Sequence, residues 1–141
     1  MKKLLLTAVV AFSTLVASAQ FMVVTTYDGD QEENMDKITA NMGIGYMVND
    51  MITVGIANGG DDIDGEGTYD IFARYNIAQM EGAYASLTMP GDDAEDMSIG
   101  VGFAFNVWNG LYVEPNYTMP TSEDADGNRE GSFNFGLSYR F

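Results

Sequence analysis

Apolar and polar residues alternate strictly at the C-terminal end of this chain. From Phe133 to Phe141 every odd position is large and apolar, and every even position is small or polar. Successive side chains of a β-strand point to opposite faces, so the segment predicts a strand with one apolar and one polar face. This pattern suits a transmembrane β-barrel, in which lipid covers the apolar face and polar groups fill the lumen.

The same alternation recurs along the chain in segments of about ten residues, the length that a tilted strand needs to cross a bilayer. It predicts eight strands, over residues 20–27, 37–48, 51–59, 68–78, 82–90, 97–107, 111–119 and 131–141. The phase of the first strand stays open, because that segment is almost uniformly apolar. The predicted fold class is all-β, an eight-stranded antiparallel up-and-down transmembrane β-barrel.

The connections between these strands alternate in length. Three are short, and the Asn109-Gly110 pair in the third is a strong hairpin signal because both positions tolerate positive φ. Four are longer and rich in Gly, Asp and Glu, and they cover residues 28–36, 60–67, 91–96 and 120–130. Bacterial barrels show this alternation, with short periplasmic turns, longer outer loops and both termini on the periplasmic side.

Charged residues are nearly absent from the predicted strands, and most of the 21 acidic residues fall in the longer connections. The strand charges Asp70, Arg74, Glu114 and Arg140 all have the polar phase, which would point them into the lumen. A buried charge requires a partner, so we expect an ion-pair cluster there. This cluster has two interpretations, a structural plug or a selectivity filter in a narrow pore. The inward glycines either admit water or make space for aromatic side chains.

The N-terminal residues 1–19 have the features of a cleaved secretory signal peptide. A basic Met1-Lys2-Lys3 start precedes an apolar run, and Ala17-Ser18-Ala19 is a small-x-small cleavage site. The alternative is a retained membrane anchor, but the apolar run is shorter than the roughly 20 residues that a spanning helix needs. We therefore expect one mature domain, residues 20–141.

The signal peptide, the eight alternating strands, the long polar loops and the terminal Phe141 together resemble the small outer-membrane barrels of the OmpA/OmpX type. The resemblance is architectural and covers the whole mature chain. It implies a location in the bacterial outer membrane, contact with outer-membrane lipid, and recognition by the barrel assembly machinery. Phe135, Tyr139 and Phe141, on the apolar face of the last strand, would carry the assembly signal.

The composition offers little for catalysis or for nucleic-acid binding. The chain has no histidine and no cysteine, which removes the commonest general base, the usual transition-metal ligands and thiol nucleophiles. Its formal net charge of −15 argues against nucleic acid, which requires a basic surface. We therefore expect no enzymatic activity and no cofactor, apart from weak calcium binding at the loops.

Two acidic loops contain fragments of calcium-binding patterns. Asp62, Asp64 and Glu66 flank a glycine in one loop, and Asp124 and Asp126 precede a glycine in another. Calcium takes several oxygen ligands, but neither loop completes the twelve-residue EF-hand pattern. The alternative is a solvated acidic surface without bound metal.

Three functional hypotheses remain open at this point. The first is a non-enzymatic outer-membrane barrel with a largely closed polar lumen and a structural or surface-interaction role. The second is a narrow pore for water or small cations. The third is a secreted soluble β-barrel that binds an apolar ligand inside, as lipocalins do, which would invert the two faces of every strand.

Overall fold

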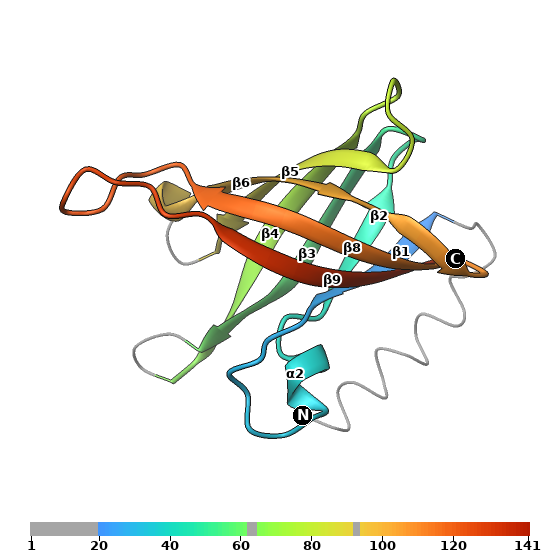
Figure 1. The fold of residues 1–141 in the computed structure, drawn as a ribbon. Helices are drawn as coiled ribbons and strands as arrows, with labels where there is room; N and C mark the ends of the chain where they lie inside the picture. The colour runs from blue at the N-terminus through green and yellow to red at the C-terminus, as the bar shows by residue number, and fades with distance from the viewer. Residues whose placement is uncertain (1–19, 62–64, 92–93) are drawn as a thin grey trace.

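The computed structural model describes residues 20–61, 65–91 and 94–141 (Figure 1). These residues form a closed antiparallel β-barrel, so the predicted all-β fold class is confirmed. The predicted signal peptide lies outside the described residues. No helix in the described ranges is long and apolar enough to cross a membrane.

The wall is built from strands that pair with their neighbours in sequence. They are β1 (Phe21–Thr26), β2 (Gly43–Met47), β3 (Ile52–Asp61), β4 (Gly67–Asn76), β5 (Ala83–Pro90), β6 (Ser98–Phe103), β7 (Phe105–Trp108), β8 (Leu111–Pro120) and β9 (Ser132–Arg140). Two short helices, α2 (Asp36–Thr39) and the 3₁₀ turn η2 (Ala94–Asp96), lie in the connections. The order is β6-β5-β4-β3-β2-β1-β9-β8-β7, and pairing of β6 with β8 closes the ring.

The segments β6 and β7 are two halves of one barrel strand. The pairing with β8 continues in one register across the break, from Gly102↔Asn116 to Phe105↔Val113. Ala104, between the halves, still donates its backbone N–H to the Gly82 carbonyl at 2.8 Å. The ring therefore has eight strands, as the alternating pattern predicts.

The short turns and Phe141 lie at one end of the barrel, and the longer connections lie at the other (Figure 1). At the third short turn Asn109 and Gly110 have φ values of 26° and 86°, as the hairpin signal predicts. At the first, the side-chain oxygen of Asn49 accepts the backbone N–H groups of Met51 and Ile52. The alternation of loop lengths along the chain therefore places the short turns at one end of the barrel and the longer connections at the other.

The strand predicted over residues 37–48 is wrong in its first part. Residues Asp36–Thr39 form α2, and β2 begins only at Gly43. The backbone N–H of Thr39 bonds to the Met35 carbonyl at 3.0 Å, a helical contact. Met35, Ile38 and Met42 have helical spacing, whereas the later part of the segment has strand spacing. Periodicity alone therefore does not decide between a helix and a strand here.

The outward face of the wall is apolar, and large apolar side chains there are solvent-exposed. In the middle of the strands these include Val54, Ile56, Ile71, Leu87 and Val101. Aromatic residues follow towards both ends: Tyr27, Tyr69, Tyr117 and Phe133 near the loops, and Tyr46, Tyr75, Phe103, Phe105, Trp108 and Tyr139 near the turns. The outer face therefore has an apolar band in the middle and aromatic side chains towards both ends.

The inward face is polar or small, with a few packed apolar side chains. Thr53, Glu114 and Ser138 are buried there together with Phe72 and Tyr84. The pairing register also shows which residues of β1 point inward. Buried Met22 pairs with Gly45 and with Arg140, and it therefore points inward. The soluble ligand-binding hypothesis needs apolar side chains inside, and this orientation is the opposite of that requirement.

Candidate functional site in the barrel lumen

A buried carboxylate organises the inside of the barrel. Glu114, in β8, is only 2% exposed, and its Oε1 accepts hydrogen bonds from Arg74 Nη1 at 2.8 Å and from Ser138 Oγ at 2.6 Å. Arg140 Nη2 lies 3.6 Å from the same oxygen. Three groups from two strands, β4 and β9, therefore converge on one atom of β8, and two of them are cations.

The topology explains how these residues meet. Glu114 is paired with Gly136, and Ser138 and Arg140 follow it in phase along β9, so all point inward. Arg74 comes from β4, which is separated from β8 in both directions around the ring. The Arg74–Glu114 ion pair therefore crosses the lumen. It can do so because an eight-stranded barrel is only wide enough inside for side chains to fill.

Each arginine also stacks on a tyrosine. The guanidinium carbon of Arg74 lies 4.0 Å from the centre of the Tyr84 ring, and that of Arg140 lies 3.9 Å from the centre of the Tyr112 ring. Such cation–π contacts stabilise a desolvated guanidinium. The buried Nε atoms of both arginines have no hydrogen-bond partner among the described residues. The rings and the shared carboxylate are therefore the main stabilising contacts of the two buried cations.

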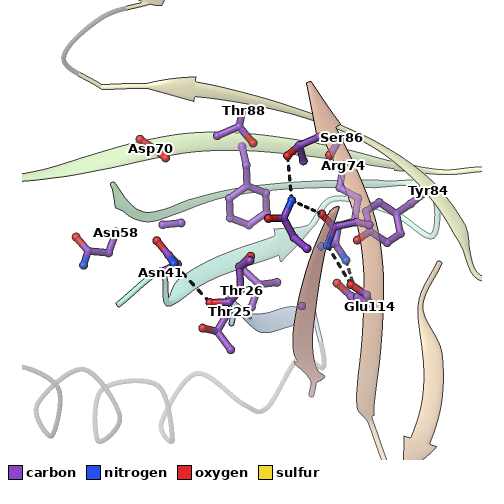
Figure 2. Close-up of a pocket in the computed structure, with 17 residues that line it drawn as sticks. Thr25, Thr26, Asn41, Asn58, Asp70, Arg74, Tyr84, Ser86, Thr88 and Glu114 are labelled. Atoms are coloured by element: carbon purple, nitrogen blue, oxygen red, sulfur yellow. Dashed lines mark hydrogen bonds and ion pairs between the residues drawn. The ribbon is translucent and has the colours of Figure 1, made fainter. Parts of the chain in front are cut away.

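The cluster formed by Arg74, Glu114, Ser138 and Arg140 separates two cavities. The outer cavity, of about 340 Å³, is lined by Arg74 and Glu114 together with polar side chains of several strands (Figure 2). The inner cavity, of about 290 Å³, is lined by Arg140 and Tyr112 near the short turns. This lumen cluster therefore forms a septum across the interior.

The fourth residue of the predicted cluster lies apart from the septum. Asp70 lines the outer cavity nearer the loops, where β4 pairs with Ala57 and Pro90 (Figure 2). A Cβ added to Gly59 would lie 2.6 Å from Asp70 Oδ1. The structure thus brings together Arg74, Glu114 and Arg140 and places Asp70 towards the mouth. Ser138, which the sequence analysis did not single out, shares the inward phase of Arg140.

Inward glycines make space for the aromatic side chains of the lumen. A Cβ on Gly55 would lie 2.5 Å from Phe72 Cζ, and a Cβ on Gly102 would lie 2.6 Å from the Tyr84 hydroxyl oxygen. Such distances are shorter than any van der Waals contact. Of the two roles that the sequence leaves open, these glycines therefore have the packing role.

The terminal aromatic residues have the outward phase expected of them. Phe135 and Tyr139 are exposed on the outer wall, and the Tyr139 and Phe141 rings form an edge contact with centroids 4.9 Å apart. The backbone N–H of Phe141 donates to the Phe21 carbonyl at 2.9 Å and so joins the C-terminal residue to β1. Their role as an assembly signal stays a prediction.

The calcium hypothesis receives no geometric support. Asp62 and Asp64 lie outside the described residues, and among the described residues no three acidic side chains are grouped as metal ligands. Asp124 Oδ1 accepts the backbone N–H groups of Asp126 and Asn128 at 2.9 and 2.8 Å, so this carboxylate orders its own loop. Calcium binding at Glu66 and its neighbours stays a prediction, and calorimetry with calcium against sodium at equal ionic strength tests it.

Comparison of this chain with protein-family models, curated proteins and solved structures gave no match. Its closed eight-stranded antiparallel barrel is consistent with the architecture of OmpA/OmpX-type proteins. A fold does not specify a function, so the function depends on the chemistry of the side chains on the outer face and in the lumen.

Proposed function

We propose that this chain is a non-enzymatic barrel protein of the bacterial outer membrane, with a largely closed lumen. Its role would be structural or surface-interactive, through the acidic loops at one end. The observation that carries the proposal is the apolar outer face of the wall. Lipid is the solvent in which such a face is stable, and closure of the ring pairs the strand edges that lipid could not satisfy.

The distribution of strand charges supports the same proposal. Asp70, Arg74, Glu114 and Arg140 belong to the inward phase, while Asp61 ends β3 on the side of the loops. An ionised side chain facing the middle of the bilayer would cost several kcal/mol. Inward placement avoids that cost.

The septum supports a closed lumen. Its ion pairs and stacked rings connect residues of β4, β5, β8 and β9 across the interior, and inward glycines let Phe72 and Tyr84 pack against the wall. A rigid septum of this kind opposes ion flow, since an ion would have to break a buried pair to pass.

A narrow pore is the second candidate, and the two cavities on either side of the septum favour it. The lumen cluster lies between them, since Arg74 and Glu114 line the outer cavity and Arg140 lines the inner one. The septum carries two guanidinium groups against one carboxylate, which disfavours small cations at the constriction. In this second candidate, water is therefore a better permeant than a cation.

Conductance in planar bilayers tests the closed lumen against a pore that passes ions, and osmotic swelling of vesicles tests it against a pore that passes water. We expect the wild-type protein to give no resolved channel steps, and Glu114→Gln to give short openings because the septum loses both ion pairs. Glu123→Gln is the matched control, because Glu123 pairs with Arg129 at 3.5 Å on an exposed loop. Steady conductance of the wild type would overturn the closed lumen and favour the pore.

A further inference from the structure

The helix α2 lies against the outer surface of the barrel wall, at the loop end of β1 (Figure 1). Met22 is buried in the lumen, and the pairing of Thr25 with Leu137 gives the Thr25 side chain the opposite, outward phase, while the residue also borders the outer cavity. The Thr25 hydroxyl donates to the carbonyl of Ile38 in α2. The helix is therefore attached to the side of the wall that carries the apolar belt.

Local contacts hold this segment in place. The backbone N–H of Asp28 donates to the Lys37 carbonyl at 2.8 Å, next to the Thr25 contact. The Asp28 carboxylate accepts from the Gln31 side chain and from the Asp30 backbone, each at 3.0 Å, and these bonds lower the pKa of Asp28. Asp36 in the first turn and Lys37 in the last also suit the helix dipole.

This fixed segment nevertheless presents apolar side chains to the surroundings. Met35 is 69% exposed and Ile38 is 41% exposed. Residues three positions apart in a helical segment lie on the same side, so the two form one small apolar surface. Tyr27, also exposed and outward, continues this surface on the wall itself.

We infer that α2 is an interfacial anchor, with Met35 and Ile38 inserted at the boundary between the headgroups and the acyl chains of the outer leaflet. The inference rests on the proposed function. Lipid is the occupant because α2 contacts β1 at its loop end, where the exposed Tyr27 of the apolar outer face adjoins Asp28, which bonds to Lys37 of the helix. The apolar surface also lies level with the loop ends of the strands, where the hydrocarbon region should end. Lys37 beside the apolar pair has the position that interfacial segments give to a basic residue, with its charge directed to the headgroups.

Depth-dependent fluorescence quenching tests this anchor. Trp108 is the sole tryptophan of the chain, so Trp108→Phe provides a silent background. Met35→Trp is the reporter, and Ile38→Trp is a second reporter that serves if the first fails to fold. Val101→Trp, at an exposed mid-strand position, reports on the belt, and Ala125→Trp, in an exposed loop, reports on water. Each variant is refolded into phosphatidylcholine vesicles with acyl chains brominated either near the headgroup or deeper.

Bromine near the headgroup should quench the Met35→Trp variant at least half as strongly as it quenches Val101→Trp, and deeper bromine should quench it less. The Ala125→Trp variant should keep its fluorescence in both lipids. Loss of quenching in Met35→Trp alone would overturn the anchor and leave the outer-membrane proposal standing, and a second copy of the chain covering α2 would give this result. Loss of quenching in Val101→Trp as well would overturn both the anchor and the outer-membrane proposal.

Discussion

Glu114 holds the lumen together at the scale of single residues. It accepts Arg74 and Ser138 on one oxygen and lies within ion-pair distance of Arg140. Its inward phase and the need for a buried partner were readable from the sequence. Counting positions along the predicted strands also places Arg74 and Arg140 at a depth comparable to that of Glu114, so their pairing was readable as well. The convergence of Arg74, Ser138 and Arg140 on one oxygen was not, because it depends on the register around the closed ring.

Replacement of Glu114 by Gln should destabilise the barrel by about 3–5 kcal/mol, since it leaves the largely buried Arg74, and the partly exposed Arg140 beside it, without a counter-charge. Unfolding by urea in detergent or lipid, followed by the heat-dependent gel shift of barrels, measures this change. Glu123→Gln, which breaks an exposed pair, should cost less than about 1 kcal/mol. An equal loss of unfolding free energy in the two variants would show that the ion pairs of the septum stabilise the barrel no more than an exposed ion pair does.

Gly55→Ala should also destabilise the barrel, by about 1–3 kcal/mol, because the new methyl group collides with the backbone carbonyl of Ile44 and with the Phe72 ring. Gly67→Ala is the control, since a Cβ there meets no atom within 4 Å. The same unfolding assay compares them. A Gly55→Ala variant as stable as Gly67→Ala would mean that the lumen is loosely packed, with space for water beside Phe72.

At the scale of elements, strands with strong alternation were predictable and the first connection was not. The segment from Ser132 to Arg140 forms β9 with the expected faces, because lipid and lumen demand opposite side chains at every step. The strand prediction was wrong for residues 37–42, because their apolar spacing fits both a helix and a strand. Backbone hydrogen bonds to the carbonyls of Met35 and Asp36 form the helix. The phase of β1 needed its two neighbours, since its own sequence has no polar face.

The last strand also carries the prediction on assembly. Deletion of Phe141 removes the outward terminal ring, its contact with Tyr139 and a backbone hydrogen bond to Phe21. We expect less folded barrel in the outer-membrane fraction and more misassembled periplasmic protein. Phe133→Ala is the control, because it removes an equally outward ring far from the terminus. Unchanged membrane levels of the Phe141 deletion would argue against a terminal signal.

At the scale of the whole molecule, closure of the ring was implied by an even number of strands with alternating loop lengths. The septum, which divides the interior into two cavities, follows from long-range register and could not be read from local pattern. The acidic loops gather at one end because all four long connections lie there. What those loops contact is set by partners that composition does not specify.

Refolding of residues 20–141 in plain buffer and in lipid vesicles tests the central claim most directly. The apolar outer face predicts a folded, heat-modifiable barrel only with detergent or lipid, and aggregation in buffer alone, because exposed apolar surface of this extent drives association. Sedimentation and circular dichroism distinguish the outcomes. A monodisperse, β-rich monomer in plain buffer would contradict the outer-membrane proposal.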